Sequence, residues 1–395
     1  MATNDHKLSN KQQVLLELVK AGLFGRTDIT ESTEKFSWAS VDWGEVYGLA
    51  SVQGVLGLVL AGLERIRNFD ANLLETYGTS KKVRANINIP QALLLQMIGE
   101  VQMTEQQNKT MNAFIAEVVG KMRAADIYTL LVKGQGVAQC YEKPLWRPSG
   151  DVDFLLSEEN YKKAKAFLLP LSSENKNEER YSQHLGMNIM QWYVEIHGSL
   201  RTGLAARVDR VVDKVINSVF CGGNVRSWNN GGVQVFLPAP TEDVFLVFTH
   251  FIKHFYKEGM SLRQVCDWCR LLYTYRDSLD YRLLEKWVRN AGLMEEWCAF
   301  GTLAVNWLGM PEEAMSSGSR SLDKPSDKVE RMVNDSWRSK KAEMLMAFVL
   351  GGYSGSKVKD TWQIAKIFPW KVLRYSPSIF LNVNWLKMKE RLVHG

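Results

Sequence analysis

The feature that most constrains this chain is a pair of aspartates, Asp151 and Asp153, on a short apolar stretch that follows a glycine-containing turn. Residues 133–156 have the pattern of a strand, a turn, a helix, a loop and a second strand. Because side chains at positions i and i+2 of a strand point to the same face, the second strand directs both carboxylates together. Like charges repel, and a bound divalent cation relieves that repulsion. The stretch therefore predicts a metal site of the kind that supports phosphoryl or nucleotidyl transfer.

The turn before the acids contains Gly134 and Gly136, with Gln135 between them and Lys133 just ahead. Glycines let a backbone approach phosphate groups closely and offer N–H groups to them. The helix expected after the turn adds the positive end of its dipole at the same point. We therefore expect these four residues to bind the phosphates of a nucleotide.

Four further residues are expected at this site. Arg147 and Ser149 lie shortly before the acids, where a guanidinium can neutralise a phosphate oxygen and a hydroxyl can hydrogen-bond to it. Glu195 lies on a later expected strand, where it supplies the third carboxylate of a two-metal site for Mg²⁺ or Mn²⁺. His197 shares its strand face, and three roles are open for it: metal ligand, contact with the acceptor, or a cap on the sheet.

Composition places the site in a protein of several domains. The 395 residues suggest about two to three domains, and a hydrophobic content of 46% supplies a sizeable core. The chain starts without an apolar signal segment, and its longest apolar run, 54–62, is shorter than the ~20 residues of a membrane span. Five cysteines in such a chain indicate reduced thiols, so we expect a cytoplasmic protein. Cys266 and Cys269 lack a second pair, which favours ordinary helix packing over a zinc or redox site.

The pattern along the chain divides it into three expected regions. Residues 1–125 and 241–395 have mostly helical periodicity, and the first of these lacks clustered acids or histidines, which is typical of a helical scaffold. Residues 126–240 carry the short β-branched runs that predict a small mixed β-sheet. The expected fold class is therefore α+β, with a sheet-containing core between N-terminal and C-terminal helical regions.

Local signals predict the individual elements. The expected helices are 11–24, 43–66, 90–125 and 158–169, with a further helix that begins at Thr241. The expected strands are 127–132, 152–156, 187–196 and 232–237. Residues 316–326 are rich in Ser, Gly, Asp and Lys and predict a surface loop.

The motifs together resemble the bacterial uncharacterised nucleotidyltransferase family, a branch of the polymerase-β-type nucleotidyltransferase superfamily that is common in Bacteroidetes genomes. The residues that carry the likeness are Lys-Gly-Gln-Gly at 133–136, Arg-Pro-Ser-Gly-Asp-Val-Asp at 147–153, Glu-Ile-His at 195–197 and, less specifically, His250-x-x-x-His254 and the N-terminal helices. The resemblance implies a small mixed sheet flanked by helices, with NTP and Mg²⁺ as ligands. It also implies metal ligands at Asp151 and Asp153, phosphates near Gly134, and transfer to an acceptor hydroxyl.

Two positions depart from the pattern of that superfamily. Gln135 replaces its second Gly or Ser, and Glu195 stands where Asp is commoner in this branch. The main hypothesis is a nucleotidyltransferase that releases pyrophosphate and acts on a sugar, a peptide, a protein or RNA. A second is a degenerate module that binds a nucleotide or partner without chemistry, which Gln135 keeps open. A third is an RNA-end-modifying or toxin-like transferase.

The C-terminal helices contain three polar residues that are expected on the acceptor side. His250 and His254 are one helical turn apart, which is a metal-ligand spacing. No Glu follows the first histidine, so a structural role or a contact with the acceptor is favoured over zinc. Arg263 is either paired with Asp267 on the helix surface or a contact to a nucleotide phosphate.

The formal net charge of +6 is concentrated after residue 355, where the chain has eight Lys or Arg residues and two acids. Trp362, Trp370 and other aromatic residues lie among these cations. The tail is therefore open to two interpretations. It is either a terminal helix pair whose lysines extend over the core, or a surface for an anionic partner such as RNA or a membrane.

Overall fold

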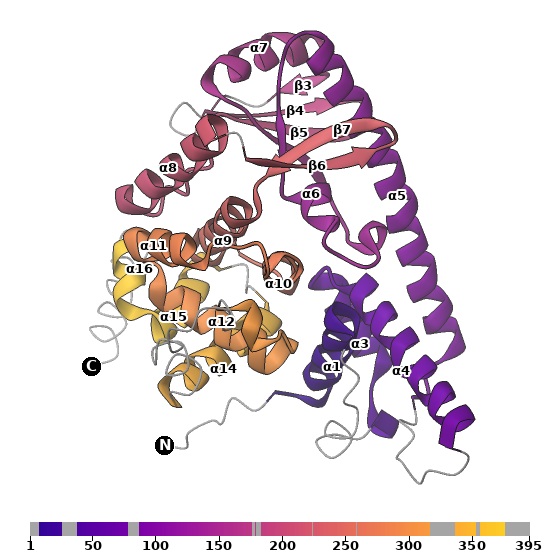
Figure 1. Ribbon diagram of the computed structural model, residues 1–395. Helices are drawn as coiled ribbons and strands as arrows, with labels where there is room; N and C mark the ends of the chain where they lie inside the picture. The colour runs from indigo at the N-terminus through magenta and orange to yellow at the C-terminus, as the bar shows by residue number, and fades with distance from the viewer. Residues whose placement is uncertain are drawn as a thin grey trace, which may run out of the picture.

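The computed structural model combines one mixed β-sheet with helices on several sides, and Figure 1 shows the sheet at the top and most of the C-terminal helices below it. The α+β class is confirmed. The residues that the structure describes are 8–25, 38–77, 87–175, 178, 183–222, 224–257, 259–316, 336–352 and 356–375. Most of the expected loop at 316–326, and the tail beyond residue 375, lie outside this described part.

The sheet has seven strands in the order β3-β4-β5-β2-β1-β7-β6. Their bounds are β1 Leu130–Val132, β2 Asp151–Leu155, β3 Glu174–Asn175, β4 His184–Ile189, β5 Trp192–His197, β6 Val225–Asn230 and β7 Val233–Pro238. The central pair β2 and β5 is parallel, and its register places Asp153 beside Glu195. On the other side β2 pairs with β1 in antiparallel fashion, so that Val132 lies opposite Asp153.

One prediction about the strands was wrong, and strands were also missed. The run 187–196 is not one strand but parts of β4 and β5, which form a hairpin that pairs Ile189 with Trp192. Met190 in the turn of this hairpin has a φ of 55°, a value that favours glycine or asparagine. Because neither residue is present in this turn, the sequence carries no hairpin signal there. Strand β6 was not predicted, although the Gly231-Gly232 turn that joins it to β7 is a recognisable hairpin signal.

The N-terminal helices are α1 Asn10–Phe24, α3 Trp43–Val52, α4 Leu56–Tyr77 and α5 Gln91–Ala124, with a 3-10 turn at Trp38–Ser40. The expected helix 43–66 is thus two helices, broken at Gly54, whose φ is 66°. Helix α5 runs along one side of the molecule from the N-terminal helices to the sheet (Figure 1). Its first half packs with the N-terminal helices, and its buried residues from Met111 to Met122 pack against the sheet.

The remaining helices flank the sheet and fill the C-terminal region, with α7 at the top of Figure 1 and α9 to α16 below the sheet. Their bounds are α6 Gly134–Ala138, α7 Glu158–Leu168, α8 Ala206–Gly222, α9 Pro240–Lys257, α10 Leu262–Tyr275, α11 Tyr281–Ala291, α12 Met294–Leu308, α14 Ser336–Gly351, α15 Lys357–Ile367 and α16 Pro369–Tyr375, with 3-10 turns at Pro144–Trp146, Leu169–Leu171 and Glu312–Ala314. Helices α1, α4, α9, α10 and α12 share one apolar core. The boundaries expected at residues 125 and 240 remain a prediction. Among the described residues, no helix combines the length and apolar character that crossing a membrane requires.

Helices α1 and α4 cross closely because glycines lie at their contact. A Cβ on Gly62 would lie 2.1 Å from the backbone oxygen of Leu18, and one on Gly22 would lie 2.1 Å from that of Leu58. Backbone cannot move aside as a flexible side chain can, so both positions require glycine.

We predict that Gly62→Ala lowers the free energy of unfolding by about 1–3 kcal/mol or more, because the added methyl group forces α1 and α4 apart. The matched control is Gly99→Ala in helix α5, where a Cβ would meet nothing within 4 Å. That change should leave stability unchanged or raise it by up to about 1 kcal/mol, since alanine favours a helix over glycine. Chemical denaturation of both variants checks this. Equal stability of the two variants would contradict the conclusion that the close contact of α1 and α4 requires glycine.

Candidate active site

Three carboxylates converge where β2 lies beside β5. Asp151 and Asp153 are two residues apart on β2, and Glu195 is the β5 partner of Asp153. One carboxylate oxygen from each of the three lies within 4.8 Å of the others. The predicted triad therefore exists as a geometric cluster. Three carboxylates form an all-oxygen donor set, which suits a hard divalent cation such as Mg²⁺ or Mn²⁺.

Basic side chains offset the charge of these acids. Asp153 is almost fully buried, and its Oδ1 lies 2.8 Å from Lys133 Nζ and 2.7 Å from His197 Nε2. Burial alone would raise the pKa of Asp153, but Lys133 and His197 hold it below its ordinary value. The negative charge of Asp153 in turn raises the pKa of Asp151. The network thus holds Asp153 as a carboxylate in a place where water cannot solvate it.

Glu195 is held by two histidines. His184 Nε2 lies 3.2 Å from one carboxylate oxygen, and His197 Nε2 lies 3.5 Å from the other. Burial opposes ionisation of Glu195, but these histidines lower its pKa well below the ordinary range. His184 was missed by the sequence interpretation. It faces His197 across the hairpin, and only the correct hairpin register reveals that relation.

His184, Glu195 and His197 form a second cluster whose donor atoms are close enough to surround a metal ion. The two imidazole rings, however, are stacked with centroids 4.7 Å apart and planes only 6° from parallel. The lone pair of an imidazole nitrogen lies in the ring plane, and nearly parallel planes do not bring two lone pairs to one ion. This geometry favours the carboxylate triad as the metal site and gives the histidines the task of positioning its carboxylates.

The glycine turn has a strained entry. Lys133 has φ 58° and ψ −148°, a region that residues with a Cβ rarely adopt, and Gly134 follows with φ 36°. This backbone conformation turns the chain sharply at the end of β1. In the resulting arrangement Lys133 Nζ lies within hydrogen-bond distance of Asp153. Gly136 has a packing role as well, because a Cβ there would lie 2.9 Å from Leu237.

The side chain of Gln135 is buried and turned toward helix α5, where its Nε2 lies 2.6 Å from Asn108 Oδ1. The amide therefore does not extend toward the acids. Any contact between this residue and a nucleotide is left to its backbone.

Arg147 makes a buried ion pair that the sequence did not indicate. Its Nε and Nη2 donate to the two carboxylate oxygens of Asp267 at 2.7 Å each, and its Nη1 donates to Ser149 Oγ at 2.6 Å. Tyr141 donates a further hydrogen bond to Asp267. Asp267 therefore pairs with Arg147, and the expected surface pair with Arg263 was wrong. Arg263 instead donates to the backbone oxygen of Pro148 at 2.7 Å.

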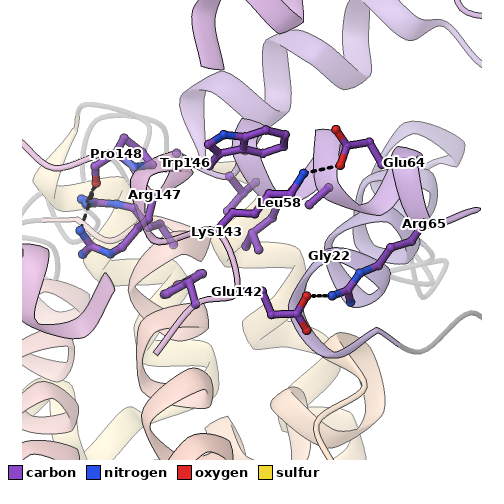
Figure 2. Close-up of a pocket in the computed structure, with 15 residues that line it drawn as sticks. Gly22, Leu58, Glu64, Arg65, Glu142, Lys143, Trp146, Arg147 and Pro148 are labelled. Atoms are coloured by element: carbon purple, nitrogen blue, oxygen red, sulfur yellow. Dashed lines mark hydrogen bonds and ion pairs between the residues drawn. The ribbon is translucent and has the colours of Figure 1, made fainter. Parts of the chain in front are cut away.

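The loop that precedes Asp151 is also held from its other side. Figure 2 shows Glu142 paired with Arg65 and Lys143 paired with Glu64, which ties the loop to helix α4. Trp146 lies beside the same contact between the loop and α4 (Figure 2). A Cβ on Gly57 would lie 2.3 Å from the Trp146 backbone oxygen. A small cavity of about 90 Å³ remains between these groups. The residues leading to the acids are thus fixed between α4 and α10.

A larger cavity of about 550 Å³ opens beside the triad. Asp151, Glu195, His184 and His197 line one side, and helix α9 lines another. The α9 residues are His250, Lys253, His254 and Lys257, and the loop 199–203 with Arg201 contributes further. A second cavity of about 150 Å³ continues past Gly134 to Arg263. The expected acceptor-side residues therefore all lie on cavity walls, whereas Arg201, Lys253 and Lys257 were missed.

The cavity wall on α9 contains a histidine pair. The Nε2 atoms of His250 and His254 are 3.0 Å apart. Burial lowers the pKa of His250 well below its ordinary value, and nearby Lys133 and His254 act in the same direction. His250 is therefore neutral at physiological pH and offers one hydrogen-bond donor and one acceptor rather than a charge.

Comparison with known proteins identifies the family to which the chain belongs. The model of a family described as uncharacterised nucleotidyltransferase matches residues 39–309. The chain belongs to this family. The matched segment contains all seven strands, the acid triad and α9, whereas α14 to α16 lie beyond it. Neither the search of curated proteins nor the search of solved structures found a match.

We predict that Asp267→Ala lowers the free energy of unfolding by about 3–5 kcal/mol, because it leaves the buried Arg147 guanidinium without its counter-charge. Glu158→Ala removes an exposed pair with Lys162 and should change stability by less than about 0.5 kcal/mol. Urea unfolding of both variants measures the difference.

The double variant Arg147→Met/Asp267→Met separates a structural role for Arg147 from phosphate binding. Replacing both charges with apolar side chains of similar size restores much of the stability that Asp267→Ala loses. If Arg147 serves only the fold, nucleotide binding survives in this variant. Loss of binding in a stable double variant would assign Arg147 to the nucleotide.

The five cysteines are free thiols, and all except Cys221 are buried. Burial raises the pKa of Cys140 to about 11 and also raises the pKa values of Cys266 and Cys269. Because the thiolate is the reactive form, we predict that a maleimide labels Cys221 alone in the native protein and all five thiols in urea. Mass spectrometry of tryptic peptides reads the pattern. Rapid native labelling of Cys266 or Cys269 would contradict the packing role of that pair.

Proposed function

We propose that this protein is a cytoplasmic, metal-dependent nucleotidyltransferase that moves an NMP group from an NTP to an acceptor hydroxyl and releases pyrophosphate. The observation that carries the proposal is the convergence of Asp151, Asp153 and Glu195 to within 4.8 Å of one another at the side of a cavity of about 550 Å³ with a basic opposite wall. Membership in a nucleotidyltransferase family supports the same reaction class.

The three acids fit Mg²⁺ or Mn²⁺, which in such a site supplies charge neutralisation at the α-phosphate and lowers the pKa of the attacking hydroxyl. Glu195 is better suited to ligate a metal than to accept a proton, because its low pKa makes it a weak base. Lys133 neutralises Asp153 and also lines the cavity, and we propose that it contacts the phosphates there. The backbone of residues 134–136 and the Ser149 hydroxyl are the further proposed phosphate contacts.

The acceptor enters from the α9 side of the cavity in this proposal. His250 and His254 offer hydrogen bonds there, and Lys253, Lys257 and Arg201 supply positive charge. The acceptor itself is a hydroxyl-bearing sugar, peptide, protein or RNA. We further propose that residues 126–240 form the catalytic core, with 1–125 and 241–395 as helical regions that hold its loop and wall its cavity.

We predict that Asp151→Asn reduces nucleotidyl transfer by about a thousandfold or more, which corresponds to the several kcal/mol that a metal contributes. Asp151 lies at an exposed strand end, so the fold should survive, and circular dichroism checks this. Transfer of label from an α-³²P NTP to acceptors in a bacterial lysate, with Mg²⁺ or Mn²⁺, is the measurement. Glu158→Gln, an exposed acid on α7, is the matched control.

Fluorescent NTP binding distinguishes the enzyme from a degenerate binding module. The module would bind nucleotide in the wild-type protein but transfer no label with any acceptor fraction. Metal-dependent nucleotide binding that is equally tight in Asp151→Asn and Asp153→Asn would overturn the site itself.

A further inference from the structure

Helices α15 and α16 present a set of exposed residues that the proposed reaction does not use. We call this set the basic-aromatic face, and its members are Lys359, Trp362, Lys366, Pro369, Trp370, Leu373 and Arg374. On α15 the members are three or four residues apart, which places them on one side of the helix. Those on α16 continue the surface directly after Phe368. The face lies outside the segment that matches the family.

The tryptophans on this face are unusual for the molecule. Trp370 is 81% exposed and Trp362 is 37% exposed. Every other tryptophan whose side chain the structure describes is buried or half-buried. Exposing two large indoles next to Leu373 and Pro369 keeps apolar area in contact with water, and such patches commonly mark a contact surface.

The charges on the face are of one sign. Lys359, Lys366 and Arg374 are exposed, while Asp360, the acid found among described residues 356–375, is buried. Lys366 Nζ lies 4.8 Å from the centre of the Trp362 ring, so the ammonium group and the indole are in contact on the surface. Lys371 is turned inward instead and pairs with buried Glu296. Among the described residues, Lys359, Lys366 and Arg374 make no ion pair, so their charges remain directed at solvent.

The exposure does not result from loosely attached helices. Phe368 packs edge-on against Phe255, and Tyr375 packs against Tyr256, both of helix α9. Ile364, Phe368 and Val372 are buried beneath the two helices. One side of α15 and α16 is thus part of the core, and the other is presented on a fixed platform.

We propose that the basic-aromatic face docks reversibly onto an anionic lipid membrane surface. Interfacial helices combine Lys and Arg with Trp and Leu in this way, because indoles prefer the headgroup level and cations attract anionic lipids. The aliphatic area of Leu373 and Pro369 favours lipid over nucleic acid, because a headgroup layer buries such area and a polyphosphate chain does not. The inference is independent of the transfer reaction.

The test uses the full-length protein and co-sedimentation with vesicles. One vesicle is phosphatidylcholine alone, and the other contains about one third phosphatidylglycerol, which supplies the negative surface potential. We expect binding to the anionic vesicle only, and we expect added salt to weaken it. Lys366→Glu/Arg374→Glu should weaken binding by about 25-fold or more, since each cation contributes about fivefold. Trp370→Ser should weaken it by about tenfold or more.

Matched controls change exposed residues elsewhere. Lys121→Glu/Lys162→Glu reverses two exposed lysines on α5 and α7, and Met103→Ser removes a 73% exposed apolar side chain from α5. These variants should bind anionic vesicles as the wild type does. Because all the substituted side chains are exposed, the variants should fold, and circular dichroism confirms it.

Three results would overturn the proposal. The first is absence of binding to anionic vesicles at low salt. The second is an equal loss of binding in the control variants, which would indicate a general charge effect. The third is binding of a short single-stranded RNA that the face variants abolish while no vesicle binds, which would assign the face to nucleic acid.

Discussion

The mutual repulsion of three carboxylates is the constraint on which this structure depends. Burying Asp153 without compensation would cost several kcal/mol, and Asp151 and Glu195 add to its field. Lys133 and His197 offset that cost directly at Asp153, and His184 acts on Glu195. These side chains come from β2, β4, β5 and the residue that follows β1, so the network depends on the strand order β4-β5-β2-β1. The strand order brings the basic side chains to the carboxylates, and the resulting ion pairs in turn stabilise that strand order.

The helical regions contribute to the site by fixing one loop. Residues 141–150 cross from the glycine helix to β2, and they carry no sheet hydrogen bonds of their own. Helix α10 holds them through Asp267, which accepts from Arg147 and Tyr141. Helix α4 holds them through Glu64 and Arg65. The loop is therefore held in place by α4 and α10, which are more than a hundred residues apart in sequence. Their contacts fix the position at which β2 begins, with Asp151 as its first residue.

The sequence predicts what depends on local periodicity and misses what depends on distant partners. Asp151 and Asp153 were predicted because strand alternation places them on one face, and Glu195 was predicted because a third carboxylate on a neighbouring strand completes such a site. The structure brings the three together, although the bounds of the third strand were wrong. Arg147 and Gln135 lie beside the motif and were predicted to contact the nucleotide, which stays a prediction, whereas the contacts of their side chains with Asp267 and Asn108 were missed. Those partners are 120 and 27 residues away, and no local pattern connects them. His184 was missed because the Met190 turn gives no glycine signal.

Charge at the two proposed binding surfaces is organised differently. In the cavity, the cations are constrained by the fold: Arg201 pairs with Asp213, and Lys257 donates to the backbone oxygen of Gly203. On α15 and α16, Lys359, Lys366 and Arg374 face solvent. Helix α9 lies between the two surfaces, because His250 and Lys253 line the cavity while Phe255 packs against Phe368. An α-helix with its side chains is about 10–12 Å thick. A membrane at the basic-aromatic face would therefore lie close to the cavity without requiring any residue of its wall.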